Sequence, residues 1–258
     1  MKLTFLGTGT SFGVPQLGCG CEVCRSEDPR DTRTRVGAAV ETDGGAVLLI
    51  DTPPELRIQL LRSGITRVDA VLYTHGHADH THGIDDLRAI TAREGTHLPV
   101  YGARDTLDEL ARKFAYIFDD TIKAAPGTSK PQARAIELAP GRPMRIADVD
   151  VTAVSLPHGP VTVFAYRIGA LAYVTDAKSI PAESLALLRG ARVLVVNALF
   201  RRPHPSHLSL GEALEAARAV GAERTYLTHL THDNFHATLA AELPAGVEPA
   251  YDGLTITV

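Results

Sequence analysis

Residues 74–80 read Thr74-His75-Gly76-His77-Ala78-Asp79-His80, and they follow an apolar run at 68–73. The apolar run predicts a buried strand, and the polar stretch predicts a loop at its end. Such a loop lets three imidazoles and a carboxylate converge on one point from a rigid base. These groups together suit zinc, manganese or iron. The alternative is a polar surface turn, but histidine is scarce and its other uses rarely cluster in this way.

Composition narrows the class of protein. The chain has 258 residues, of which 45% are hydrophobic, and we expect a single domain over residues 1–258. The net charge of −4 gives no global basic field for nucleic acid. Residues 1–6 are too short for a signal peptide, and no apolar run approaches the ~18 residues of a membrane span.

The cysteines form a second cluster. Cys19, Cys21 and Cys24 are an odd number within one short segment, which is a poor disulfide framework and favours a reduced, cytoplasmic compartment. Three thiols can occupy three corners of a tetrahedral zinc site, which a histidine from elsewhere would complete. The alternative is three free structural thiols. The charged run that follows predicts a solvated surface; it contains Asp28, Arg30, Asp31, Arg33 and Arg35.

Hydrophobic periodicity and turn residues predict the remaining elements. The expected strands are 3–6, 36–42, 46–50, 68–73, 98–101, 133–138, 149–156, 161–168, 171–175, 192–196, 224–228 and 254–258. The expected helices are 53–62, 83–93, 105–117 and 181–188, with a further helix that a capping box at Ser209 and Glu212 opens and that ends near Gly221. The irregular segment 118–132 predicts either a lid over one face or an ordinary connection.

The strands fall into two groups, each followed by helices. We therefore expect two sheets packed face to face with helices outside. Several polar residues come at strand ends, where a scaffold can bring them together. They are Asp51, His158, Asp176, His207 and His229. Each is weak evidence alone, but beside the histidine cluster each becomes a candidate ligand or a partner of one.

This ordered set resembles the metallo-β-lactamase superfamily. The matching residues are His75, His77, Asp79 and His80, then His158, Asp176 and His229, and Asp51 matches the superfamily's first motif. The resemblance covers nearly the whole chain. It implies the α/β (α+β) fold class, as the four-layer αββα sandwich.

A closer resemblance lies within the superfamily. The cysteine cluster and the stretch Thr228-His229-Leu230-Thr231-His232 are similar to the family of cyclic-phosphate phosphodiesterases of the carbon–phosphorus lyase pathway, which open phosphoribosyl 1,2-cyclic phosphate. The resemblance implies a structural zinc ion held by Cys19, Cys21, Cys24 and His232. His207 matches an active-site histidine of that family, and His204 is its rival three residues earlier.

The resemblance also implies two divalent catalytic ions, manganese or zinc. His75, His77 and His158 would bind one ion, and Asp79, His80 and His229 the other, with Asp176 between them. Asp79 would orient the nucleophile or accept its proton. His207 would neutralise a phosphoryl oxygen or protonate the leaving group. Asp51 would orient a ligand histidine through its other ring nitrogen, or else cap a turn.

The function expected is therefore metal-dependent hydrolysis of a small cyclic or nucleotide-like phosphodiester, with 5-phosphoribosyl 1,2-cyclic phosphate as the specific candidate. The alternatives are an endoribonuclease of the transfer-RNA 3′-processing type, a thioester or lactam hydrolase, and a non-enzymatic metal-binding protein. We expect neither a membrane nor a nucleic acid as partner. The resemblance allows a homodimer, because phosphodiesterases of the superfamily are often dimers, although the sequence shows no specific interface signal. We expect His97 and His236 at the surface, and His82 either at the surface or in contact with a metal ligand.

Overall fold

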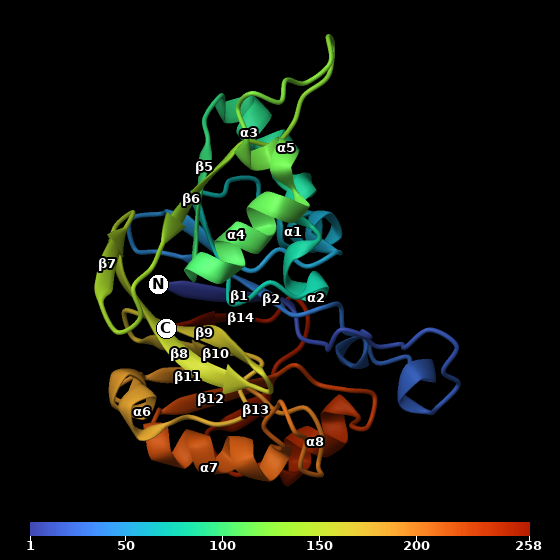
Figure 1. Ribbon diagram of the computed structural model, residues 1–258. Coiled ribbons are helices and arrows are strands. Elements are labelled where there is room, and N and C mark those ends of the chain that lie inside the picture. Colours follow the sequence, from blue (N-terminus) through green and yellow to red (C-terminus); the bar gives the residue numbers. More distant parts are fainter.

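The computed structural model describes residues 1–258 and contains two seven-stranded sheets. The sheets face each other, and helices cover their outer faces (Figure 1). This arrangement confirms the expected αββα sandwich. None of its helices combines the length and the apolar character that crossing a membrane requires.

The first sheet is built from the N-terminal half of the chain plus the last strand. Strands β3 to β6 are parallel, and β14, β1, β2 and β3 pair antiparallel. The order is β14 (Thr255–Thr257), β1 (Lys2–Gly7), β2 (Gly37–Glu41), β3 (Val47–Ile50), β4 (Ala70–Leu72), β5 (Leu98–Gly102) and β6 (Ala133–Glu137).

The second sheet comes from the C-terminal half. Strands β10 to β13 are parallel, and β7 to β10 pair antiparallel. The order is β13 (Val247–Pro249), β12 (Arg224–Thr228), β11 (Val193–Asn197), β10 (Leu171–Val174), β9 (Val161–Ile168), β8 (Val149–His158) and β7 (Pro143–Ile146).

Three apolar clusters hold the layers together. In β1, Leu3 and Phe5 point into the cluster between the sheets, whereas Leu6 points to the helices outside, as the two-residue period of a strand requires. Five helices belong to the first half of the chain: α1 (Leu56–Ser63), α2 (Ala78–Thr81), α3 (Arg88–Glu94), α4 (Arg104–Lys113) and α5 (Ala115–Phe118). Three follow in the second half: α6 (Ala182–Leu188), α7 (Leu210–Val220) and α8 (His236–Glu242).

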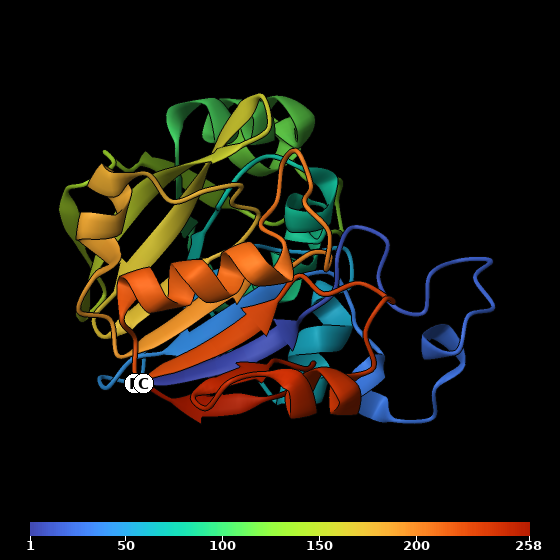
Figure 2. The same cartoon turned by 90° about the horizontal axis from the view of Figure 1, so that it is seen from below.

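Residues 8–35 form an arm between β1 and β2. The arm extends from the body in two views at right angles (Figures 1 and 2) and contains two short 3-10 helices, η1 (Val23–Arg25) and η2 (Pro29–Asp31). The predicted solvated surface is wrong for its base, where Asp31 is 3% and Arg33 2% exposed. Arg33 donates to Thr8 Oγ1 at 2.9 Å and to the carbonyl of Ala250 at 2.7 Å.

The prediction for His236 is wrong for the same reason. Its ring is 5% exposed and packs edge-on against Tyr251, and its backbone N–H donates to Asp31 at 2.6 Å. The arm folds back onto the C-terminal segment there. Asp31 and Arg33 therefore bond to His236 and Ala250, which lie 205 and 217 residues later in the chain. His97 and His82 are exposed, as expected.

Segment 119–132 lies away from the histidine loop. It ends where Leu98 donates to the carbonyl of Gln132, and His97 contacts Asp120 at 2.8 Å, so it borders the amino ends of β5 and β6. The histidine loop follows the carboxyl end of β4, which is parallel to β5. The lid prediction is therefore wrong, and the segment is an ordinary connection.

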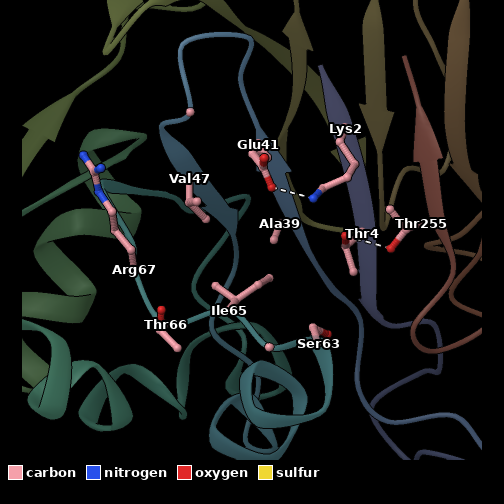
Figure 3. A pocket seen from close by; sticks show the side chains of 12 residues that line it. Lys2, Thr4, Ala39, Glu41, Val47, Ser63, Ile65, Thr66, Arg67 and Thr255 are labelled. Carbon is pink, nitrogen blue, oxygen red and sulfur yellow. Dashed lines mark hydrogen bonds and ion pairs between the residues drawn. The ribbon is translucent and has the colours of Figure 1, made fainter.

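A pocket of about 320 Å³ lies on the outer face of the first sheet, beyond the end of α1 (Figure 3). Lys2 and Glu41 line it and already pair with each other at 2.6 Å. None of the clusters of metal-ligating groups that the structure forms lies in this pocket.

Candidate metal centre

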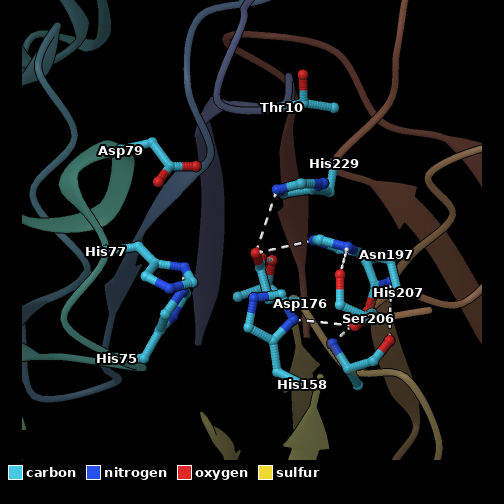
Figure 4. A network of polar contacts seen from close by, with 12 residues as sticks. Thr10, His75, His77, Asp79, His158, Asp176, Asn197, Ser206, His207 and His229 are labelled. Carbon is cyan, nitrogen blue, oxygen red and sulfur yellow. Dashed lines mark hydrogen bonds and ion pairs between the residues drawn. The ribbon is translucent and has the colours of Figure 1, made fainter. Parts of the chain in front are cut away.

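The polar residues at the strand ends come together between the two sheets. His75 follows β4 and Asp51 follows β3 in the first sheet. In the second sheet His158 ends β8, Asp176 follows β10 and His229 follows β12. The ends of all these strands meet at one edge of the sandwich, where side chains from the two halves of the chain face each other (Figure 4).

Two groups of side chains there could each hold a cation. One contains His75, His77 and His158, and the other contains Asp79, His80 and His229. Within each group the nearest ligand atoms lie within 4.8 Å of one another. In the first, His75 Nε2 and His77 Nδ1 are 2.9 Å apart. His77 is exposed, so the centre opens to solvent on that side.

Asp176 lies between the two groups. Its Oδ1 is 3.5 Å from His80 Nε2, and its Oδ2 is 3.4 Å from His229 Nε2. It also shares a candidate ligand cluster with His158. One carboxylate therefore reaches ligands of both groups, which is the position expected of a bridging residue.

Several buried imidazole nitrogens of these groups have no hydrogen-bond partner in the protein and could instead bind a metal ion. His80 Nε2, His229 Nδ1 and His229 Nε2 are buried and have no hydrogen-bond partner. An unsatisfied buried polar atom costs about 1–3 kcal/mol. Both Nε2 atoms face Asp176, so a cation between these groups would satisfy them at once.

The electrostatics point the same way. Burial lowers the pKa of His229 to about 4, and burial also lowers the pKa of His75 well below its ordinary value. Both imidazoles are thus neutral near pH 7 and have lone pairs to offer. Burial alone would lower the pKa of His80, but Asp176 and Asp51 outweigh it and raise that pKa well above its ordinary value. The position between these two carboxylates therefore attracts positive charge.

Other residues hold the ligands in place. Asp51 Oδ2 lies 2.7 Å from His80 Nδ1, and Asp51 Oδ1 accepts from the backbone N–H of Thr74 at 2.8 Å. His158 Nδ1 donates to the carbonyl of Ser206 at 2.9 Å. Each contact leaves the other ring nitrogen free to face the centre. Asp51 thus contacts the candidate ligand His80 and does not merely cap a turn.

Helix α4 supports the loop between His75 and His77. Lys113 donates to the carbonyl of Gly76 at 3.0 Å and pairs with Glu109 at 2.7 Å. A side chain at Gly76 would collide with the Glu109 carboxylate. The glycine therefore permits a close approach between loop and helix.

Asn197 is a supporting residue that sequence reasoning missed. It is fully buried, its Oδ1 accepts from the N–H of Ala177 at 2.9 Å, and its Nδ2 donates to the carbonyl of Ala177 at 3.2 Å. These two bonds fix the peptide directly after Asp176. The sequence signal that could have identified Asn197 is its position as the one polar residue at the end of the apolar strand β11.

His207 is the histidine of its loop that reaches the centre. Its Nε2 lies 3.1 Å from Asp176 Oδ2. His204 contacts His207 instead, with 3.4 Å between their Nδ1 atoms. The geometry thus favours His207 over His204 as the group nearest the reacting atoms.

The cysteine cluster forms a separate site at the arm. His232 Nδ1 lies 3.4 Å from Cys19 Sγ, 3.8 Å from Cys21 Sγ and 3.4 Å from Cys24 Sγ. A tetrahedral zinc ion with Zn–S near 2.3 Å and Zn–N near 2.0–2.1 Å separates sulfur from nitrogen by about 3.6 Å. The four ligand atoms therefore have the spacing of a zinc site, and the cysteines form no disulfide.

Comparison with known families agrees with this architecture. The model of the beta-lactamase superfamily domain matches residues 47–230, which include both histidine groups. The chain belongs to the metallo-β-lactamase superfamily. The residue pattern in the sequence had implied this family, and the match confirms it.

Within the superfamily the chain is close to the PhnP family. The crystal structure of a protein described as a new diphosphatase from the PhnP family is 40% identical, with a TM-score of 0.90 over 99% of this chain and 96% of that one. Zn²⁺-bound PqqB from Methylobacterium extorquens has a TM-score of 0.78 at 20% identity over the full length of both chains, which shows a shared fold.

A curated relative carries a different name. The octanoyltransferase of Porphyromonas gingivalis is 40% identical over 98% of this chain, but the match covers 51% of that protein. The chain spans about half the length, or less, of the first curated relatives it matches. That relative's activity belongs to a protein about twice as long. The comparisons together support a hydrolase of the metallo-β-lactamase fold that is related to the PhnP-type diphosphatase.

Proposed function

We propose that this protein is a phosphoric diester hydrolase with two divalent metal ions, manganese or zinc, acting on a small cyclic or nucleotide-like phosphodiester. The observation that carries the proposal is the pair of three-ligand groups on either side of Asp176, with buried imidazole nitrogens that lack any other partner. The 40% identity to a PhnP-family diphosphatase supports phosphoryl chemistry. The specific candidate is 5-phosphoribosyl 1,2-cyclic phosphate.

The charges of the ligands suit an anionic substrate. The two groups and Asp176 together contain five imidazoles and two carboxylates, so two divalent ions would leave the centre positive. Such ions lower the pKa of water and stabilise charge on phosphoryl oxygens. In this proposal His75, His77 and His158 would hold one ion and Asp79, His80 and His229 the other, and Asp176, which reaches both groups, would lie between them.

The protein's own groups would move the protons. Asp79, partly exposed at the open side, would orient the attacking water or accept its proton. His207 reaches Asp176 from the opposite side of the centre and would donate a proton to the leaving oxygen. Asp51 and Ser206 would keep His80 and His158 in the orientation that presents Nε2 to the centre.

The second proposed site is structural. Cys19, Cys21, Cys24 and His232 would hold one zinc ion between the arm and the segment that follows His229. Leu230 donates its N–H to the carbonyl of Thr8, so the start of the arm also lies against this segment. The ion would therefore brace one wall of the metal centre.

A substrate panel tests the proposal. The protein, loaded with manganese or zinc, is given bis-p-nitrophenyl phosphate, a diphosphate diester, an octanoyl thioester and a cephalosporin. We expect turnover of the phosphorus substrates and its loss in Asp176→Asn. Turnover of the thioester or the lactam in place of the phosphodiester would overturn the proposal. Equal turnover in the Asp176→Asn variant would show that the centre is not the site of reaction.

The ribonuclease alternative has less support. It requires a long groove of positive charge for the RNA backbone. The net charge is −4, and many of the arginines pair with carboxylates, including Arg30, Arg35, Arg67, Arg88 and Arg104. A pre-tRNA with a 3′ trailer, added to the same panel, would reveal such an activity directly.

A further inference from the structure

Beyond His207, the loop after β11 carries a row of cationic and aromatic side chains that the proposed reaction does not use. The loop is closed at its base, because Leu199 donates to the carbonyl of Leu208 at 3.0 Å and Leu210 to that of Phe200 at 2.8 Å. His158 Nδ1, which donates to the carbonyl of Ser206, ties the loop to the metal centre. Residues 200–207 are thus held beside the reacting atoms.

The row of side chains is continuous from the centre to the rim. His207 lies 3.1 Å from Asp176, and the rings of His204 and His207 are 5.3 Å apart. The rings of Phe200 and His204 are 5.7 Å apart, and the guanidinium of Arg202 sits 4.6 Å above the Phe200 ring. Arg202 is exposed at the outer end of this row.

Arg202 differs from the neighbouring cations in having no anionic partner. Arg201 donates to Asn234 at 2.9 Å and pairs with Glu242 at 2.7 Å. Lys178, two residues after Asp176, pairs with Glu212 at 2.7 Å. Arg202 makes neither a hydrogen bond nor an ion pair, and stacking on Phe200 holds it in place. The N–H groups of its planar guanidinium remain free, and two of them can donate parallel hydrogen bonds to two oxygens of one phosphate.

We propose that Arg202, positioned by Phe200 and with His204 beside it, binds a second anionic group of the substrate, a terminal phosphomonoester. The proposal rests on the proposed function, since it assumes that the metal centre holds the scissile phosphodiester. The candidate substrate named above, 5-phosphoribosyl 1,2-cyclic phosphate, carries such a group, so Arg202 would be the residue that selects for it.

A matched pair of substrates tests this subsite. Adenosine 2′,3′-cyclic phosphate and its 5′-phosphorylated form share the scissile group and differ in the terminal phosphate. We expect the wild-type protein to prefer the phosphorylated form in kcat/KM, chiefly through KM. In Arg202→Gln that preference should fall roughly tenfold, the size of one charge-assisted contact. Arg202→Lys, which keeps the charge but not the planar guanidinium, should lie between.

Arg201→Gln is the matched control, because it removes the same charge one residue away from a side chain that is already paired. It should keep the wild-type preference. A wild-type preference near one, an unchanged preference in Arg202→Gln, or an equal fall in Arg201→Gln would overturn the subsite.

A binding measurement separates this proposal from the proposed function. Ribose 5-phosphate is titrated calorimetrically into the metal-loaded wild-type, Arg202→Gln and Arg201→Gln proteins. The subsite predicts binding that weakens roughly tenfold in Arg202→Gln and is retained in Arg201→Gln. If neither cyclic phosphate is hydrolysed, the proposed function fails, whereas the titration still decides the subsite. Equal binding by all three proteins would contradict it.

Discussion

Three residues of the metal centre have a backbone conformation that only glycine adopts freely. The φ angles are 64° at Asp51, 57° at Asp176 and 56° at His229. A left-handed conformation costs a non-glycine residue about 1–2 kcal/mol. Such strain persists only where the surrounding structure enforces it, and it concentrates at functional sites. Its presence at three strand ends that converge supports the view that this edge is built for chemistry.

Asp51→Asn tests the support of a ligand without altering the backbone preference, because asparagine also tolerates a positive φ. The change removes the negative charge that faces His80 Nδ1. Loss of such a partner typically costs 10- to 100-fold in metal affinity or activity. We expect a fall of about that size in kcat/KM, measured with metal content on the same sample. Asp69→Asn, at the other end of β4, is the control, and an equal effect there would contradict the role of Asp51.

Asn197→Leu removes the two bonds to the Ala177 peptide. Each buried group left without a partner costs about 1–3 kcal/mol, so we expect a clear drop in Tm. Because that peptide follows Asp176, kcat of the folded protein should fall as well. Gln59→Leu removes another buried amide, which bonds Thr34 and Arg35 away from the centre. It should lower Tm without lowering kcat, and a loss of stability alone in Asn197→Leu would show that Asn197 is only structural.

Among the elements of the fold, the arm exposes apolar side chains to solvent. Two large apolar side chains on it are exposed, Phe12 at 65% and Leu17 at 94%. Arg33 and Asp31 tie the base of the arm to the C-terminal segment, whereas residues 19–24 are tied to it by the cysteine site. The order of residues 19–24 should therefore depend on the proposed zinc ion.

Cys21→Ser should lower the zinc content by one ion per chain and expose the arm to proteolysis. Desolvation raises the pKa of the Cys24 thiol to about 11, so binding of zinc to the metal-free protein at neutral pH should release protons. Metal analysis and limited proteolysis check the first expectation, and calorimetry in buffers of different ionisation enthalpy checks the second. Unchanged zinc content in Cys21→Ser would contradict the site.

At the scale of the whole molecule, the sequence predicted what is locally encoded. Strong alternation and capping signals gave most strands and helices, including the capping box of Ser209 and Glu212, which is present in full. The short elements β7, β13 and α8 were missed because a three- to seven-residue segment carries too little periodic signal. Helix α2 was missed because it lies inside the metal motif itself.

Features that depend on long-range contacts could not be predicted in this way. The last strand, β14, crosses back to pair with β1 in the first sheet. Asp31 and Arg33 look like surface residues until the C-terminal segment covers them. Asn197 gains its role only from a neighbour twenty residues earlier, across two parallel strands. The candidate ligands could be named in advance because their order along the chain resembles the motifs of the metallo-β-lactamase superfamily.

The proposed function requires the chain to gather two cations between its sheets. Anomalous diffraction from crystals grown with manganese or zinc would locate them. We expect two peaks, one among His75, His77 and His158 and one among Asp79, His80 and His229, with Asp176 in contact with both. Crystals that show no anomalous peak between these side chains would contradict the proposal.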